Sequence, residues 1–187
     1  SSMVNSGIDT VGVITPSNYR SLADHLNMGR EWGLNKKQGG MFMLPGAVHG
    51  LKDLHARFSL RDVILNRQFF LRADEDTVLI CAANRIYNMD FRPAIAQHQK
   101  SGAAATLIYK TIQHGESATG LFLTIGPGGQ VTGISEKAVG EANCFLDCLL
   151  IQRKLVLDLI ECYQNLGYID IMDILAVNLG QIQVDTW

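Results

Sequence analysis

The chain has 187 residues, 47% of them hydrophobic and 18% charged, which fits one globular α/β domain with a sizeable core. Its 16 basic and 18 acidic residues give no single-sign charge that would indicate nucleic acid or an anionic membrane as a partner. No apolar run approaches the roughly 20 residues that cross a bilayer, and the start of the chain lacks a signal-peptide pattern. We therefore expect a cytoplasmic protein.

The first part of the chain predicts short helices and strands separated by glycine-rich segments. In chain order these are a strand at 11–15, a helix at 17–27, a long and partly structured loop at 33–50 that contains the apolar run 41–44, and a helical pattern at 60–71. Residues 3–6 are expected to end a helix, with Gly7 as its C′ residue. Because the chain then starts inside a helix, we interpret it as a fragment of a larger polypeptide.

The second part predicts alternating strands and helices with one hairpin. In chain order these are a strand ending at 83, a helix after Pro93, a strand at 104–110, two strands at 121–125 and 130–134 joined by Gly126-Pro-Gly-Gly129, a strand at 143–150, and helices at 153–165 and 168–179. This order predicts an α/β fold of Rossmann-like type. Its sheet would be mostly parallel, or mixed, with an antiparallel hairpin insertion.

The most informative stretch is the apolar run 77–83, which stops abruptly at Asn84. In open α/β sheets ligands bind beyond the carboxyl ends of the strands, so Asn84 is expected at a binding edge. A carboxylate at this position could hold a metal ion and a phosphate, whereas a neutral amide binds Mg²⁺ far less strongly. Arg85 beside it is either a phosphate contact or an ordinary surface residue.

Several segments together resemble the ADP-glucose pyrophosphorylase (glucose-1-phosphate adenylyltransferase) family, and within it the bacterial GlgD-type subunit. The resemblance rests on the segment 3–15, on Ile86-Tyr-Asn-Met-Asp-Phe91, and on Gly120 followed by a hairpin and Ser135-Glu-Lys137. It implies a nucleotidyltransferase-type domain, of which 1–187 would be one part. The family's glycine-rich phosphate loop would lie upstream of this chain, and its left-handed β-helix downstream.

The resemblance also assigns candidate site residues. Gly120, Glu136, Lys137 and Asp53 would contact the substrate, which in this family is ATP together with glucose-1-phosphate. The Asp that would coordinate Mg²⁺ in active members is replaced by Asn84, so no metal ligand is assigned and the role of Mg²⁺ is put in doubt.

Further departures from the family occur around these positions. Pro16 replaces a Gln near the base pocket. Phe145 and Asp147 replace a Ser and a Gly of the sugar-side strand, where they would crowd the glucose pocket and place a charge in it. These changes favour a regulatory or weakly catalytic subunit of glycogen biosynthesis, assembled with a catalytic homologue in a hetero- or homo-tetramer.

Three alternatives remain open. The chain could belong to an active adenylyltransferase in which Asp53 or Asp90 replaces the missing carboxylate. It could act on another sugar phosphate, such as mannose-1-phosphate, or bind nucleotide without any link to glycogen.

The remaining candidate groups favour structural roles. The four cysteines show no zinc-like pairing with histidine and are expected to be reduced and mostly buried. The five histidines form no metal-ligand spacing. Asp170 and Asp173 could face a pocket, but acidic residues in a first helical turn more often cap the helix.

Overall fold

The computed structural model describes residues 2–15, 19–36, 39–46, 56–113, 119–138 and 141–187. The helices are α1 Ser2–Asn5, α2 Tyr19–Leu26, the 3₁₀ helix η1 Asn27–Trp32, α3 Leu60–Leu65, α4 Arg67–Leu71, α5 Arg92–Ser101, α6 Arg153–Tyr163 and α7 Ile171–Val177. The strands are β1 Thr10–Thr15, β2 Gly40–Pro45, β3 Thr77–Cys81, β4 Ala105–Thr111, β5 Phe122–Ile125, β6 Val131–Ser135, β7 Asn143–Gln152 and β8 Val184–Thr186.

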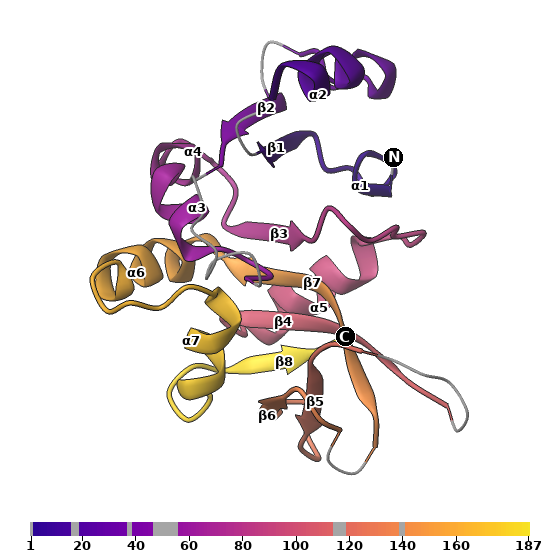
Figure 1. The fold of residues 1–187 in the computed structure, drawn as a ribbon. Helices are drawn as coiled ribbons and strands as arrows, with labels where there is room; N and C mark the ends of the chain where they lie inside the picture. The colour runs from indigo at the N-terminus through magenta and orange to yellow at the C-terminus, as the bar shows by residue number, and fades with distance from the viewer. Residues whose placement is uncertain (1, 16–18, 37–38, 47–55, 114–118, 139–140) are drawn as a thin grey trace.

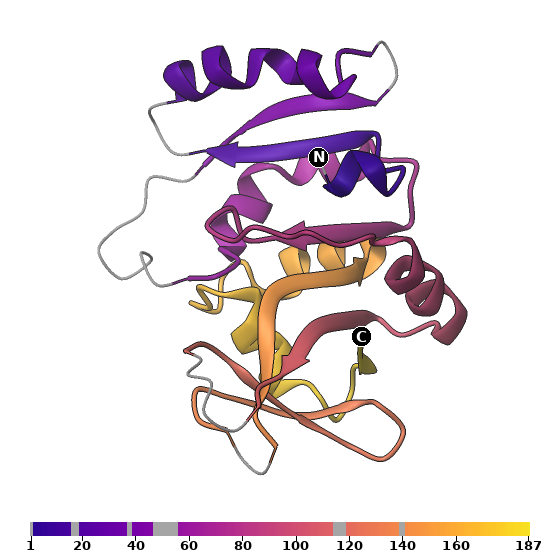
Figure 2. The same ribbon diagram turned by 90° about the vertical axis from the view of Figure 1, so that its right-hand side faces the viewer.

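The strands form a mixed six-stranded sheet and a separate parallel pair. In the larger sheet the order is β6-β5-β7-β4-β8, and β3 also pairs with β7. The smaller sheet consists of β1 and β2, paired from Thr10↔Gly40 to Thr15↔Pro45. Figures 1 and 2 show this pair stacked beyond β3, at the opposite end of the molecule from the β5–β6 hairpin.

The α/β class, the mixed sheet and the hairpin are confirmed, but antiparallel pairing is more extensive than the sequence suggested. β7 runs antiparallel to β3, β4 and β5, and within the larger sheet the one parallel pair of described strands is β4 with β8. The sequence did not indicate this direction because β7 is buried on both faces. Its continuous apolar sequence therefore resembles that of an interior parallel strand.

The segment 33–50 is more ordered than expected over its central part. The apolar run Met41-Phe-Met-Leu44 lies within β2, which pairs in parallel with β1 through a full six-residue register. The preceding helix agrees with the expected 17–27, because α2 ends at Leu26, and the separate 3₁₀ helix η1, which contains a kink at Met28 and Gly29, follows it and ends before Gly33. Gly33 has φ 66°, a left-handed conformation that glycine adopts without strain.

Helices cover both faces of the larger sheet. On one face α3, α4, α6 and α7 pack against alternate residues of β4 and β7, such as Leu107 and Leu149, to form the main core. On the other face α5 and the segment before it pack on Ile108, Cys148 and Leu150. Successive side chains of a strand point to opposite faces of the sheet, so a continuous apolar strand supplies apolar side chains to both faces.

Among the described residues, no helix has the length and apolar character needed to cross a bilayer.

Candidate functional site

The carboxyl end of β3 is a turn on the surface. The strand ends at Cys81, and Ala83, Asn84 and Arg85 follow it in exposed positions. Asn84 therefore lies where the sequence placed it, at the end of a strand of the sheet. Its amide is exposed, while the guanidinium of Arg85 turns back toward β7.

A bulge in β7 lies beside this turn. Leu107 pairs with Leu149 but Tyr109 pairs with Phe145, so the single residue Ile108 faces three residues of β7. The middle one of the three is Asp147, which has a positive φ of 52°. Figure 2 shows β7 bending sharply along its length. Bulges of this kind redirect a side chain out of the ladder, and here the redirected side chain is a carboxylate.

The Asp147 carboxylate is buried and is held by two arginines from distant parts of the chain. Arg85 donates to Oδ2 from Nε at 3.0 Å and from Nη2 at 2.8 Å. Arg57 donates to Oδ1 from Nη1 at 3.0 Å. The Asp147 side chain is only 5% exposed, against 28% for Arg57 and 44% for Arg85. Each carboxylate oxygen thus has a cationic partner, as a buried charge requires. We call these three residues the Arg57–Asp147–Arg85 cluster.

Further hydrogen bonds fix the backbone around the cluster. The Tyr87 hydroxyl contacts the backbone carbonyls of Leu146 at 3.0 Å and Asp147 at 2.7 Å. Burial raises the pKa of Tyr87 well above its usual value, so its hydroxyl stays protonated and donates. The hydrogen bonds that Arg85 donates to Asp147 raise the pKa of Arg85, which reinforces the charge of the guanidinium.

Arg57 is positioned by Asp170, at the N-cap of α7. The Asp170 carboxylate accepts hydrogen bonds from the backbone N–H groups of Arg57 and Met172, the latter at 2.9 Å. The capping role expected for Asp170 is thus confirmed, and the same side chain also anchors the Arg57 backbone. Burial raises the pKa of Asp170.

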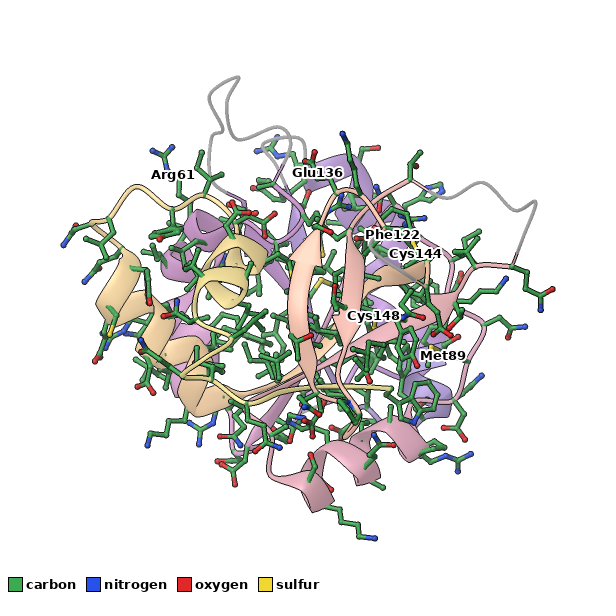
Figure 3. The ribbon with its side chains drawn as sticks, turned by 90° about the horizontal axis from the view of Figure 1, so that it is seen from below. Arg61, Met89, Phe122, Glu136, Cys144 and Cys148 are labelled. Carbon is green, nitrogen blue, oxygen red and sulfur yellow. The ribbon has the colours of Figure 1, made fainter. Side chains whose placement is uncertain are left out.

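The sugar-side candidates lie at the end of the β5–β6 hairpin. Ser135, Phe122 and Cys144 are aligned across β6, β5 and β7. Glu136 and Lys137 follow directly after Ser135 and are exposed, as Figure 3 shows for Glu136.

Cys144 lies on the same strand as Asp147 of the Arg57–Asp147–Arg85 cluster. Burial raises the pKa of the Cys144 thiol, and the charges of Arg85 and Arg57 partly offset this effect. Gly120 has φ 143°, and an added Cβ there would meet no atom within 4 Å. The substrate roles of Gly120, Glu136 and Lys137 stay predictions.

The two carboxylates considered as replacement metal ligands are placed differently. Asp53, like Pro16, lies outside the described residues. Asp90 forms a bidentate pair with Arg92, whose Nε and Nη2 lie 2.9 and 2.7 Å from Asp90 Oδ2. These hydrogen bonds lower the pKa of Asp90 to about 2. Asp90 lines a hollow of about 270 Å³ together with residues of α1, and Asn84 is not part of its lining.

The described residues do not fit a magnesium site at the end of β3. No group of three His, Cys, Asp or Glu side chains in this part of the chain is arranged to hold a metal ion. Asn84 offers only a neutral amide oxygen, and the nearby carboxylate of Asp147 already binds two guanidinium groups. A divalent cation prefers charged oxygen ligands, and here it would compete with fixed positive charges.

A second hollow lies elsewhere. It measures about 590 Å³ and is lined by Thr77, His98, Gln152 and Arg153, among others. Thr77 starts β3, so this hollow lies at the amino end of the strand, away from Asn84. Ligands of α/β sheets bind at the carboxyl ends of the strands. We therefore take the Arg57–Asp147–Arg85 cluster, together with the turn that follows β3, as the candidate site.

Comparison with known proteins shows the family of the chain. The sequence pattern of the nucleotidyl transferase family matches residues 1–156. The chain belongs to that family. Over 94% of its length it is 30% identical to the glycogen biosynthesis protein GlgD of Geobacillus stearothermophilus, and covers 42% of that protein. Over 57% of its length it is 35% identical to a glucose-1-phosphate adenylyltransferase of Halalkalibacterium halodurans, and covers 28% of it.

A solved structure supports the fold. The chain superposes with a TM-score of 0.74 on a putative glucose-1-phosphate thymidylyltransferase from Bacillus anthracis, over 100% of its own length and 70% of that chain. The two are 14% identical, so this likeness shows the fold alone. The chain spans less than half the length of the curated relatives named above.

Sequence reasoning missed Arg57 and the internal pairing of Arg85. Arg57 lies 90 positions from Asp147, and its partner Asp170 lies 113 positions away. No local pattern connects residues at such separations. The one available signal was the presence of a charged Asp147 within an otherwise apolar strand, because such a charge needs a buried partner.

Proposed function

We propose that this chain is part of a regulatory or weakly catalytic protein of glycogen biosynthesis that assembles with a catalytic homologue. The related reaction joins ATP and glucose-1-phosphate to give ADP-glucose and pyrophosphate. In this proposal the protein is cytoplasmic, forms a tetramer with its partner, and tunes that partner's response to effectors.

The observation that carries the proposal is the pairing at the end of β3. Asn84 supplies no charge where active relatives are expected to carry a metal-binding carboxylate. Arg85 does not compensate, because its guanidinium is bound to Asp147 at 3.0 and 2.8 Å. Nucleotidyl transfer depends on neutralising phosphate charge with metal ions and free cations. In this site the nearest cations neutralise the protein's own carboxylate instead.

The alternative is an active sugar-phosphate nucleotidyltransferase with a substitute metal ligand. Asp90 is a weak candidate, because its two oxygens already bind Arg92. In this alternative, Asp53 would have to supply the metal ligand.

The test is an adenylyltransferase assay of the full-length protein that carries this chain. It should be measured alone, then mixed with its catalytic homologue, at several effector concentrations. We expect little turnover alone and a changed effector response in the mixture. Turnover by the isolated protein comparable to that of the catalytic partner would refute the proposal.

Back-substitution separates the two functions. If a metal ligand has been lost, Asn84→Asp should raise Mg²⁺-dependent turnover of the full-length protein. Asn88→Asp is a matched control, since Asn88 is also exposed after β3 but lines the separate hollow with Asp90. If Asp53 supplies the metal ligand instead, Asn84→Asp should leave turnover nearly unchanged and Asp53→Asn should abolish it.

Ligand identity can be tested independently of turnover. Thermal-shift measurements with ATP, ADP-glucose, glucose-1-phosphate and mannose-1-phosphate distinguish the sugar and the nucleotide that bind. We propose that the glucose compounds give the larger shifts. A shift with mannose-1-phosphate, or with ATP alone, would instead favour another sugar substrate or a plain nucleotide-binding role.

A further inference from the structure

Two cysteines face each other directly across the β3–β7 ladder. Cys81, the last residue of β3, pairs with Cys148 of β7. Their Sγ atoms are 3.1 Å apart, and both are free thiols in this structure. The two residues lie 67 positions apart in the chain, so the fold alone brings them together.

The register favours a covalent link between them. The Ala82 N–H donates to the Asp147 carbonyl at 3.0 Å, which makes residues 82 and 147 a hydrogen-bonded pair. The adjacent pair, Cys81 and Cys148, is therefore of the non-hydrogen-bonded class, in which the Cα atoms of antiparallel strands typically lie about 4.5 Å apart. This separation lies inside the roughly 4.4–6.8 Å range that disulfides span. The bond can form without separating the strands.

The two thiols differ in accessibility, which assigns their order of reaction. Cys81 is half-buried, whereas Cys148 is fully buried in a small core that also contains Phe91 and Ala94. The hydrogen bond between the two thiols, together with burial, raises the pKa of Cys148 well above its usual value. Cys81 is thus the thiol that an external reagent meets first, and Cys148 is the one that resolves the adduct.

We propose that Cys81 and Cys148 form a redox-modification site that takes up an intramolecular disulfide by exchange with a low-molecular-weight disulfide such as oxidised glutathione. The Cys81 thiolate attacks one sulfur of the reagent and releases the first glutathione thiol. Cys148 then loses its proton and attacks Cys81 Sγ in the mixed disulfide, which releases the second. Two protein thiols are oxidised and one reagent disulfide is reduced to two thiols, so electrons and protons balance.

The site adjoins the arginine cluster. Asp147 directly precedes Cys148, and Tyr87, which holds the Asp147 carbonyl, packs on the same small core as both cysteines. Met89, labelled together with Cys148 in Figure 3, is partly buried and packs against that core. A disulfide here would tie the end of β3 to the β7 bulge, and so restrict the turn that carries Asn84 and Arg85.

The experiment is disulfide mapping of the full-length protein under native conditions. The protein is equilibrated with oxidised glutathione, its free thiols are blocked by alkylation, and peptides are identified by mass spectrometry. We expect a peptide joining Cys81 to Cys148 that disappears with dithiothreitol. We also expect the oxidised protein to melt at a higher temperature than the reduced protein, because the bond constrains the unfolded chain.

Variants distinguish the proposed site from a pair of inert core thiols. Cys148→Ala should remove the linked peptide and leave Cys81 as a glutathione adduct, because the resolving thiol is gone. Cys144→Ala is the matched control, a buried cysteine on the same strand, and should leave the linked peptide at its wild-type level. Recovery of Cys81 and Cys148 as unlinked alkylated peptides after oxidation, or a link to Cys144 instead, would overturn the proposal. A glutathione adduct at the exposed Cys162 alone would do so as well.

Discussion

Arg85 binds one carboxylate oxygen of Asp147 through two nitrogen atoms, Nε at 3.0 Å and Nη2 at 2.8 Å. The other oxygen is bound by Arg57. The carboxylate is buried while both guanidinium groups are partly exposed. This asymmetry determines which member of the cluster can be removed at least cost, because only the buried charge depends entirely on its protein partners.

Removing the arginines should destabilise the fold more than removing the carboxylate. The double variant Arg57→Met/Arg85→Met leaves a buried charge without cations, for which we expect a loss of about 3–5 kcal/mol. Asp147→Asn leaves two guanidinium groups that water can reach, for which we expect a loss of about 1.5–3 kcal/mol. Urea unfolding measures both free energies.

An exposed ion pair gives the control for this comparison. Arg67 and Glu161 lie 2.9 Å apart with side chains 43% and 63% exposed, so Glu161→Gln should cost at most about 1 kcal/mol. If Asp147→Asn proved as costly as the double arginine variant, the view that burial of the carboxylate dominates would be wrong.

Local features of the fold could be predicted from sequence, and long-range features could not. Gly126-Pro-Gly-Gly129 identifies the β5–β6 hairpin because its turn residues have few other uses, and the apolar run that stops at Asn84 identifies β3, which ends slightly earlier at Cys81. The antiparallel direction of β7 has no such signal, since both of its faces are buried. The cluster is equally hidden, because Arg57 and Asp147 meet only through the tertiary fold and the bulge.

Phe145 is expected to be essential to the core, even though relatives are expected to carry serine at this position. Its side chain is fully buried and packs edge-on against Phe58, with ring centroids 6.3 Å apart. Phe145→Ser would open a cavity and bury a hydroxyl, so we expect a loss of at least about 3 kcal/mol. Phe42→Ser is the control, because Phe42 is 44% exposed, and it should cost clearly less in the same urea titration. Equal losses would place Phe145 outside the stabilising core.

Stability should decline on mild acidification because of His98. This ring is buried, with Nδ1 2.8 Å from Thr106 Oγ1, and burial lowers its pKa. The unfolded chain, with a pKa of about 6.5, then binds protons more readily than the folded one. The free energy of unfolding should fall as pH drops below about 6.5 until the folded-state pKa is reached, by at most about 1.4 kcal/mol per pH unit.

Comparison of two histidine variants isolates this contribution. His98→Gln should flatten the pH dependence in that window, whereas His25→Gln, at an exposed position, should keep it. Urea titrations between pH 5 and 7 measure the slopes. A wild-type slope in the His98 variant would assign the effect to other groups.

Gly40 is expected to be required for the β1–β2 pair. Its φ is 104°, and an added Cβ would lie 2.6 Å from the Leu34 carbonyl oxygen, a backbone atom that cannot rotate away. Gly40→Ala therefore combines backbone strain with a clash, and we expect a loss of about 1–3 kcal/mol. Gly180→Ala is the control, since nothing lies within 4 Å of an added Cβ there, and it should leave the midpoint of urea unfolding nearly unchanged.

The β1–β2 ladder extends from Gly40 to Pro45, so loss of Gly40 should loosen β2 along its whole length. Faster amide hydrogen exchange in β2 than in β7 of the Gly40 variant would locate the effect there, and uniform exchange across both strands would contradict it.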